Sequence, residues 1–324
     1  MIKPVTNPIE VPEKPFAHKA DRMIGISAAM QRVYGLIHQA SSYPYPALIT
    51  GERGTGKRLA AQTIHSLSQR KDKSFVVADF STLAPTLAES ELFGYEKGTF
   101  AGANETQWGL LAFAREGTIF LKEVGNLPMH VQSRFVQMLQ EKEFKPIGST
   151  QPLPFKARVL AATSRDLEAE VKRGAFREDL FVRLNAAQIH LVPLRERKDD
   201  IPLLIDYFLE KYADGAETKV SGAAVAHLSG LDWPGNVREL EDTVRHAVSV
   251  RSGQTIEVSD CALRSKLPDD REWATDVTLY LDERERQSIV HALQESQGDK
   301  SSAARILGMA ESALQKRILY YHLS

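Results

Sequence analysis

At positions 51–57 the chain reads Gly51-Glu52-Arg53-Gly54-Thr55-Gly56-Lys57, after the apolar run 47–50 and before a helical pattern of apolar residues over 59–67. A strand, a glycine-rich loop and a helix in this order are the context of a phosphate-binding loop. The glycines let backbone N–H groups converge on an anion, and the helix N-terminus adds partial positive charge. We therefore predict a nucleoside triphosphate site in which Lys57 reaches the outer phosphates.

Arg58 departs from the simple form of this motif. It follows the loop lysine, at the position where the motif has the Ser or Thr that binds the metal ion. The loop therefore predicts nucleotide binding, whereas binding of the metal needs support from elsewhere in the chain.

Composition restricts the class of protein. The chain has 324 residues, of which 43% are hydrophobic, so it can bury a sizeable core in two or three domains. No apolar run approaches the ~20 residues of a membrane span, and the first residues have no signal-peptide core. The single cysteine excludes an internal disulfide, and we expect a cytoplasmic protein with no membrane partner. Because the net charge is −1, any contact with DNA must be local.

Four short apolar runs indicate the fold class. They span 47–50, 75–79, 117–121 and 158–163, and helical patterns separate them. This alternation predicts an α/β fold with a parallel sheet, whose ligands bind at the C-terminal ends of the strands.

Beyond Pro193 the pattern is helical only, over 201–212, 221–228 and 237–250. We interpret this region as a small helical lid. The predicted domains are an α/β nucleotide-binding part at 23–195 and the lid at 196–263.

The ends of the chain differ from this body. Regularly spaced prolines predict a flexible tail over 1–22, and mixed charge with proline predicts a linker over 264–279. In the last segment, 280–324, two short helical patterns flank Gly308, which is typical of a helix-turn-helix DNA-binding domain.

Seven motifs occur in a fixed order along the chain. They are Gly51 to Lys57, Glu89-Ser90-Glu91-Leu92-Phe93-Gly94, Gly117-Thr118-Ile119-Phe120-Leu121, Phe176-Arg177-Glu178-Asp179-Leu180, Arg183-Leu184-Asn185, Pro193-Leu194-Arg195-Glu196-Arg197 and Trp233-Pro234-Gly235-Asn236-Val237-Arg238-Glu239-Leu240. Together these motifs resemble one family, the bacterial sigma-54-dependent transcription activators of the AAA+ ATPase class. The stretch 300–308 is also similar to the Fis-type DNA-binding domain that ends such activators. Without a receiver or ligand-sensing domain in front, the order of domains resembles that of the phage-shock activator subgroup.

The resemblance implies ATP and Mg2+ as cofactors and assigns roles to residues. Lys57 would bind the β- and γ-phosphates, and Glu123 would act as general base on the attacking water. Arg177 and Arg183 match arginines that reach the active site of a neighbouring subunit, where they offset developing phosphoryl charge. Arg238 matches the lid arginine that senses the nucleotide.

These arginines also have an ordinary interpretation. Arg177 can form a surface ion pair with Glu178 or Asp179, and Arg238 can pair along its helix with Glu241. Such pairs are common and contribute little to stability.

The stretch Gly98-Thr99-Phe100-Ala101-Gly102-Ala103 matches the family's sigma-factor contact loop, which usually reads Gly-Ala-Phe-Thr-Gly-Ala. The resemblance implies sigma-54 RNA polymerase as a partner. An exposed aromatic residue between glycines suits a mobile loop that touches a partner. The alternative is that Phe100 packs into the core.

The chain departs from the family pattern where chemistry is expected. Lys122 replaces the Walker B Asp, Asp79 replaces the switch Asn, and Ser164 replaces the sensor Asn. Arg58 stands at a position that is usually acidic, and Ala101 replaces Thr in the contact loop. We expect Mg2+ binding to be weakened or lost, and ATP turnover to be altered or lost.

The C-terminal segment implies promoter or enhancer DNA as a second partner. Gln315 and Lys316 are the best candidates for contacts with base edges or phosphates. Glu311, near the start of the expected recognition helix, would repel phosphate. The alternative is a solvated structural helix.

Two functions remain open. The first is a ring-forming ATPase, expected as a hexamer, that binds an enhancer and remodels sigma-54 RNA polymerase. The second is a hydrolysis-deficient regulator that acts through DNA binding or in a mixed ring with an active paralogue. Lys122 with Asp79 is the feature that separates them. A generic AAA+ unfoldase is disfavoured because it has no use for residues 98–103 or for a Fis-like end.

Overall fold

The computed structural model describes residues 23–100, 103–213, 218–251 and 253–261, and six single residues between 293 and 314. The chain divides into two compact units, 1–262 and 263–324, and each is described by itself. Several predictions lie outside the described residues. They concern the tail 1–22, the linker 264–279, most of the segment 280–324, and the residues Ala101, Gly102, Gln315 and Lys316.

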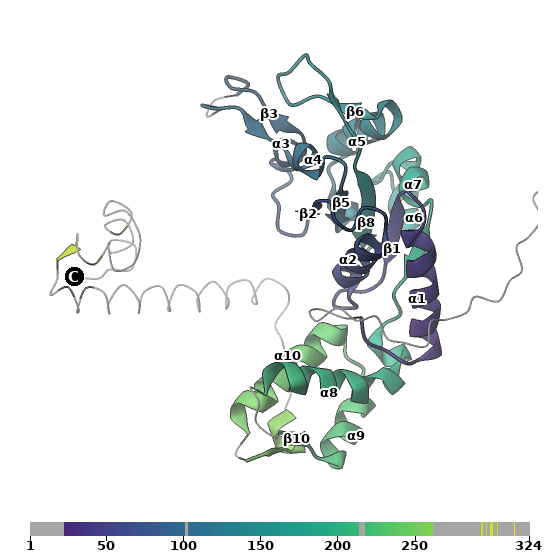
Figure 1. Cartoon of the computed structure of the whole chain (residues 1–324), viewed down its shortest axis with the longest axis vertical. Helices are drawn as coiled ribbons and strands as arrows, with labels where there is room; N and C mark the ends of the chain where they lie inside the picture. The colour runs from purple at the N-terminus through teal and green to yellow at the C-terminus, as the bar shows by residue number, and fades with distance from the viewer. Residues whose placement is uncertain are drawn as a thin grey trace, which may run out of the picture. The chain divides into compact units, whose positions relative to one another are not determined.

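A five-stranded parallel sheet forms the centre of the first unit (Figure 1). The predicted parallel α/β fold is therefore confirmed. The fifth strand, β9, was not expected, because its residues Gln-Ile-His contain one apolar side chain and give no apolar run. The strand order is β2 (Phe75–Asp79), β5 (Thr118–Lys122), β8 (Arg158–Thr163), β1 (Ala47–Thr50) and β9 (Gln188–His190).

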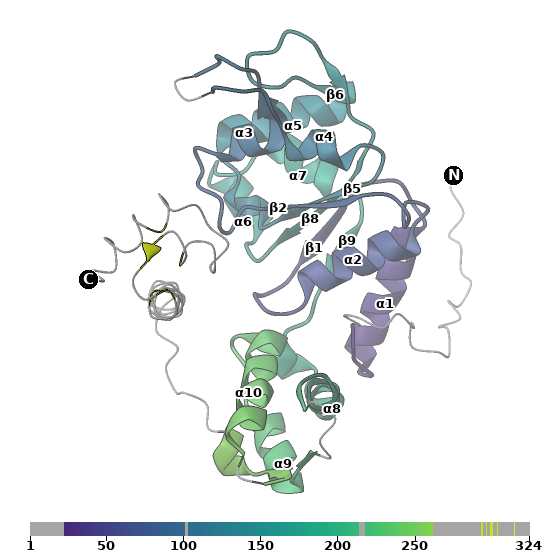
Figure 2. The same cartoon turned by 60° about the vertical axis from the view of Figure 1, so that its left-hand side comes forward.

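Helices cover both faces of the sheet (Figure 2). Successive strand side chains point to opposite faces, so β8 places Leu160 and Ala162 in one core and Val159 and Ala161 in the other. One face packs against α1 (Ala28–Ser41) and α2 (Lys57–Leu67). The other packs against α3 (Ala88–Phe93), α4 (Leu110–Ala114), α5 (Met129–Glu141), α6 (Leu167–Lys172) and α7 (Glu178–Leu184).

Two antiparallel hairpins extend from this second layer. The first joins β3 (Gly94–Tyr95) to β4 (Gln107–Trp108), and the second joins β6 (Glu143–Phe144) to β7 (Leu153–Pro154). Tyr95 also forms a bridge to Ile147 in the second hairpin. The described residues of the expected contact loop, 98–100 and 103, therefore lie between the two strands of the first hairpin, next to the second hairpin.

The region after Pro193 is mainly helical, and α8 (Ile201–Tyr212) has the predicted bounds. The expectation of helices only is wrong at one point, because β10 (Lys219–Val220) pairs in parallel with β11 (Thr255–Ile256). Two-residue strands are too short to show a period in sequence. The remaining elements are α9 (Gly222–Gly230), α10 (Asn236–Val250) and the short 3-10 turns η1 (Val124–Asn126), η2 (Leu194–Glu196), η3 (Lys198–Asp200) and η4 (Val258–Cys261).

In the second unit, Ala303 and Leu314 are helical and buried. Both residues lie in segments for which the sequence predicts short helices. Among the described residues of the whole chain, no helix has the length and hydropathy needed to cross a membrane.

Candidate nucleotide site and contact loop

The backbone of the phosphate loop requires glycine. Gly51, Gly54 and Gly56 have φ values of 144°, 79° and 101°, a region that residues with a side chain rarely adopt. A Cβ atom on Gly54 would lie 2.0 Å from the carbonyl oxygen of Gly235, so no side chain fits there. The loop joins β1 to α2, as the sequence predicts for a phosphate-binding loop.

Lys57 begins α2 and folds back over this loop. Its Nζ donates hydrogen bonds to the carbonyl oxygens of Gly51 (2.7 Å) and Glu52 (3.0 Å). It also lies 3.4 Å from Oε1 of Glu123, and both side chains are only 8% exposed. Burial lowers the pKa of Lys57, while the charge of Glu123 acts in the opposite direction. The structure thus brings together the two residues that the sequence assigned to phosphate binding and to general base.

Glu123 directly follows β5 and has a left-handed backbone conformation, with φ 55°. Its Oε2 accepts hydrogen bonds from the backbone N–H (2.9 Å) and the hydroxyl (2.8 Å) of Ser164, at the end of β8. The carboxylate is therefore fixed between Lys57 and Ser164. A serine in place of the family's sensor Asn still supplies a hydrogen-bond donor to Glu123.

Lys122 and Asp79 form an ion pair across two strands. They are register partners at the ends of β5 and β2, and Lys122 Nζ lies 2.5 Å from Asp79 Oδ2. Asp79 Oδ1 accepts further hydrogen bonds from the backbone N–H and the hydroxyl of Ser81. Burial raises the pKa of Asp79, but the hydrogen bonds from Lys122 and Ser81 outweigh it, so the pKa lies below its usual value. Two departures that looked independent in the sequence are one structural unit.

The residues at the metal positions do not fit Mg2+. In P-loop NTPases the ion is held by the hydroxyl after the loop lysine and by a carboxylate at the end of the Walker B strand. Here these positions carry Arg58, which is exposed, and Lys122. Magnesium takes oxygen ligands, and neither side chain has one.

Asn236 connects the lid to the phosphate loop through hydrogen bonds. This fully buried side chain accepts a hydrogen bond at Oδ1 from the backbone N–H of Leu194 (2.8 Å). Its Nδ2 donates to the carbonyl oxygen of Arg53 (2.9 Å) and to Oε2 of Glu52 (3.1 Å). This role of Asn236 was not predicted from the sequence. The available signal was Asn after Gly at the start of a helix, because Asn tolerates the positive φ of 57° found here.

Arg195, at the boundary between the α/β part and the lid, makes a second link to the loop. Its guanidinium donates two hydrogen bonds to the carboxylate of Glu52, at 2.8 Å and 2.6 Å. These bonds and the one from Asn236 lower the pKa of Glu52 to about 2. Glu52 was expected only as part of the loop, whereas in the structure its side chain joins loop and lid.

The three arginines assigned to catalysis and sensing lie outside this bonded group. Arg177 precedes α7, and its guanidinium pairs with Asp179 at 3.0 Å and 2.7 Å, the ordinary surface pair that the sequence allowed. Arg183 lies on α7, and its Nε is buried with no hydrogen-bond partner in the part of the chain that the structure describes. Arg238 is exposed on α10, and its Cβ would lie 3.4 Å from a Cβ placed on Gly54.

The expected contact loop closes on itself. The Gly98 N–H donates to the Ala103 carbonyl oxygen at 2.8 Å, and the Ala103 N–H donates to the Phe100 carbonyl oxygen at 3.0 Å. The Phe100 ring meets Tyr95 edge-on at 4.9 Å and remains 48% exposed. The ring is therefore not packed in the core of the described chain.

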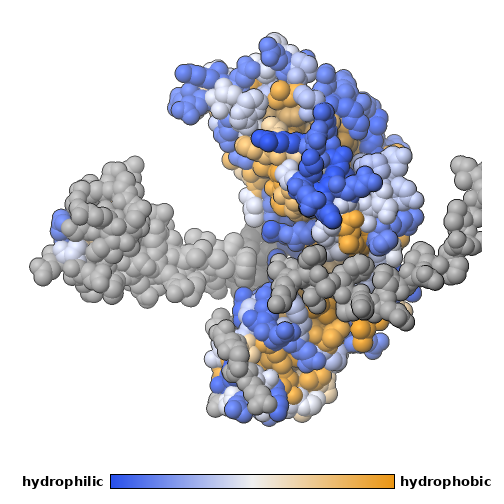
Figure 3. Space-filling model, in the orientation of Figure 1, coloured by the Kyte–Doolittle hydropathy of each residue, from blue (hydrophilic) through white to orange (hydrophobic). Residues whose placement is uncertain are grey.

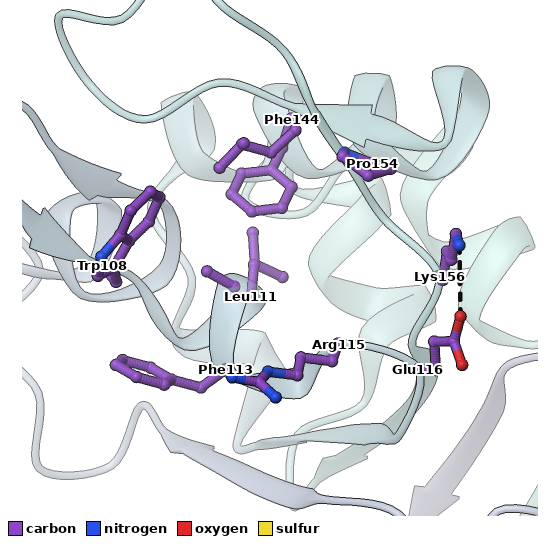
Figure 4. A pocket seen from close by; sticks show the side chains of 10 residues that line it. Trp108, Leu111, Phe113, Arg115, Glu116, Phe144, Pro154 and Lys156 are labelled. Atoms are coloured by element: carbon purple, nitrogen blue, oxygen red, sulfur yellow. Dashed lines mark hydrogen bonds and ion pairs between the residues drawn. The ribbon is translucent and has the colours of Figure 1, made fainter.

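A separate hollow of about 430 Å3 lies beside this hairpin (Figure 4). Trp108 of β4 and Phe113 of α4 are both more than half exposed. Figure 3 shows apolar surface over the α3 and α4 region on the face drawn there. The hollow is lined by Trp108, Leu111, Ala112, Phe113, Arg115, Glu116, Phe144, Leu153, Pro154 and Lys156.

Three family models match consecutive parts of the chain. The sigma-54 interaction domain matches residues 23–190, the AAA+ ATPase lid domain matches 195–273, and the Fis family of bacterial regulatory proteins matches 280–321. Together they cover both compact units.

Proteins with similar sequences are named as regulators. The DNA-binding transcriptional regulator NtrC of Salmonella typhimurium is 38% identical over 325 residues, which cover 91% of this chain and 69% of that protein. The Nif-specific regulatory protein of Herbaspirillum seropedicae is 42% identical over 242 residues, which cover 74% of this chain and 45% of that protein.

The chain is also similar in fold to proteins of solved structure. NtrX from Brucella abortus in complex with ADP has a TM-score of 0.69 at 27% identity, over 94% of this chain and 69% of that one. Its complex with ATP gives the same TM-score at 26% identity, over 93% of this chain and 70% of that one. Hsp104, at 16% identity over 68% of this chain and 43% of that one, shares only the fold, with a TM-score of 0.50.

The parallel sheet, the phosphate loop and the helical lid define an AAA+ ATPase fold, and a Fis-type helix-turn-helix domain follows it. The chain belongs to the family of sigma-54-dependent, enhancer-binding transcription activators.

Proposed function

We propose that this activator binds ATP at its phosphate loop and acts on sigma-54 RNA polymerase as an AAA+ ring bound to promoter or enhancer DNA. The observation that carries the proposal is the group formed by the loop, Lys57, Glu123 and Ser164, in which a buried lysine and a fixed carboxylate meet beside a helix N-terminus. The ADP and ATP complexes of NtrX support the nature of the ligand.

The nucleotide contacts follow from this geometry. Gly51 to Lys57 would hold the phosphates through backbone N–H groups and the ammonium of Lys57, with Arg58 and Arg238 at the rim. Because Asn236 and Arg195 tie this loop to the lid, a change in nucleotide state would alter both together. The position of the lid would therefore depend on which nucleotide the loop binds.

The ring would be homomeric, with six subunits. Arg177 and Arg183 would then reach the nucleotide of the neighbouring subunit. The Nε of Arg183 is buried and has no hydrogen-bond partner among the described residues, so the side chain is not held in place by that atom. Arg177 would have to leave Asp179 on assembly, and a surface pair of this kind opposes that only weakly.

The partners would bind at two further places. The half-exposed Phe100 at the tip of the loop 98–103 would touch the sigma factor. Gln315 and Lys316 would contact DNA. Within the chain we propose the α/β part at 23–195, the lid at 196–263, a linker at 264–279 and the DNA-binding domain at 280–324, in a protein of the cytoplasm.

The pair between Lys122 and Asp79 favours a second candidate function. It occupies the strand end where hydrolysis needs an ordered metal ion. In this candidate the chain binds nucleotide and DNA but hydrolyses ATP slowly, and regulates either through DNA binding or in a mixed ring with an active paralogue.

One experiment separates the two candidates. Steady-state ATPase activity of the purified chain would be measured alone and together with an active relative, alongside binding of a radiolabelled ATP. Turnover by the chain alone supports the first candidate. Binding without turnover, with a change in the relative's activity on mixing, supports the second, and absence of ATP binding would overturn both.

A further inference from the structure

Both side-chain positions that hold Mg2+ in P-loop NTPases are basic in this chain. Arg58 stands where a hydroxyl is expected and Lys122 where a carboxylate is expected. Relative to that motif, the site gains one positive charge at position 58 and two at position 122, or three in all. Asp79, paired with Lys122, offsets one of them. The site is therefore more positively charged than that motif even with Asp79 included.

The Lys122 ammonium has N–H donors left to bind an anionic ligand. An ammonium group has three N–H donors, and in the described structure only one of them is used, by Asp79 Oδ2. Asp79 is itself held by Ser81 through two hydrogen bonds, so the pair orients the ammonium without exhausting its donors. The Lys122 side chain is also 30% exposed, and therefore accessible to a ligand.

Lys122 lies near the loop lysine. It directly precedes Glu123, whose Oε1 is 3.4 Å from Lys57 Nζ. Burial is the main cause that lowers the pKa of Lys57, and the positive charge of Lys122 adds a smaller effect in the same direction. An anion between the two ammonium groups would relieve their repulsion. A polyphosphate has the charge to do so, whereas a divalent cation would increase the repulsion.

We propose that this site binds ATP without Mg2+, and that the Lys122 ammonium, held by Asp79, is the counterion to the phosphates that the metal ion provides in other P-loop NTPases. The inference rests on the proposed binding of ATP at the phosphate loop. It names the form of the ligand, metal-free ATP, and a specificity-determining residue, Lys122.

The test is isothermal titration of the full chain with ATP, once with Mg2+ in excess and once with EDTA in excess. We expect the dissociation constant in EDTA to lie within about threefold of the value in Mg2+ or below it, because excess Mg2+ withdraws metal-free ATP and its charge is repelled by Lys122. Binding that is more than about threefold weaker in EDTA would overturn the inference, because the site would then use the metal.

Single-residue variants test whether Lys122 is responsible for the binding of metal-free ATP. Lys122→Asp should weaken ATP binding in EDTA by about tenfold or more, and Mg2+ should restore part of it. Lys156→Asp is the matched control, because Lys156 also pairs with a carboxylate, that of Glu116, but lines the separate hollow. It should bind ATP as the parent does under both conditions. If Lys122→Asp does not fold, as judged by thermal melting, Lys122→Met serves instead and should also bind more weakly in EDTA.

Lys57→Ala separates failure of the inference from failure of the proposed function. It should abolish binding under both conditions if ATP occupies the phosphate loop. Binding by the parent only with Mg2+ would overturn the inference and leave ATP binding in place. No binding by the parent under either condition would remove both.

Discussion

Asn236, the first residue of α10, donates a hydrogen bond to the carboxylate of Glu52 in the phosphate loop at 3.1 Å. The same amide holds the Arg53 carbonyl oxygen and the Leu194 N–H, so one buried side chain joins three backbone segments. Buried polar groups that lose their partners are costly. The lid is therefore attached to the loop by polar contacts that cannot be removed one at a time without cost.

Replacement of Asn236 should destabilise the first unit. Asn236→Gly and Asn236→Ala each leave the Leu194 N–H and the Arg53 carbonyl oxygen unpaired, and we expect a loss of about 2 to 4 kcal/mol in the free energy of unfolding. The alanine variant should lose about 1 kcal/mol more, because of the positive φ at this position. Chemical denaturation measures both. Asn104→Ala, at an exposed position, is the control and should stay within about 0.5 kcal/mol of the parent.

The pair between Glu52 and Arg195 should give stability a defined pH dependence. The pKa of Glu52 is about 2 in the folded chain against 4.5 unperturbed, so its contribution is complete above about pH 4.5 and is lost as the pH falls towards 2. Both side chains are about 40% exposed, and we expect the contribution to stay below about 1 kcal/mol. Denaturation of parent and Glu52→Gln at several pH values checks this. A difference that does not shrink below pH 4.5 would contradict it.

ATP hydrolysis should be slow, below about 1 per second, the lower end of the ordinary enzyme range. Glu123 is well placed as a base, but Lys122 and Arg58 supply no ligand for the metal that phosphoryl transfer uses. A steady-state assay of the parent tests this, and a faster rate would show that the chain does not need the usual metal ligand.

Lys122→Asp should restore some activity, and more of it when combined with Asp79→Asn. Lys122→Asp alone places a carboxylate beside Asp79, and neighbouring like charges on paired strands destabilise by up to about 1 kcal/mol. Lys122→Asp combined with Asp79→Asn removes that repulsion. We therefore expect the double variant to hydrolyse ATP faster than either single variant in the same assay. Equal rates for the single Lys122→Asp and the double variant would show that the two positions are not coupled.

Phe100 should matter for the sigma factor and little for folding. Its ring is half exposed and touches Tyr95, so Phe100→Ala should change the free energy of unfolding by less than about 1.5 kcal/mol. It should nevertheless weaken binding to the sigma factor, measured in the presence of a transition-state analogue. Phe113→Ala removes an equally exposed ring outside the loop and should bind as the parent does. Equal binding by Phe100→Ala and the parent would exclude the loop as the contact.

The sequence predicted the fold where its signals are local. The apolar strands, the glycine loop and α8 all have patterns set by neighbouring residues, and the structure confirms them. β9 and the β10–β11 pair were missed, because strands of two or three residues depend on their partners rather than on their own pattern.

The same limit applies to the site. Lys57 and Glu123 could be found from motifs, and the structure brings them together. The hydrogen bonds from Asn236 and Arg195 to Glu52 join residues more than 140 positions apart in sequence, so no local pattern could reveal them. The pairing of Lys122 with Asp79 is similar, because it depends on the register of β5 against β2.

The contact of Gly54 with the Gly235 carbonyl oxygen has an evolutionary consequence. It is made by backbone on both sides, so a mutation at Gly54 cannot adjust it gradually and can only break it. Positions 58, 79, 122 and 164 lie outside this contact and can change without breaking it, although 79 and 122 are coupled as a pair. The residues around the nucleotide can therefore change over many generations while the backbone contact between Gly54 and Gly235 is kept.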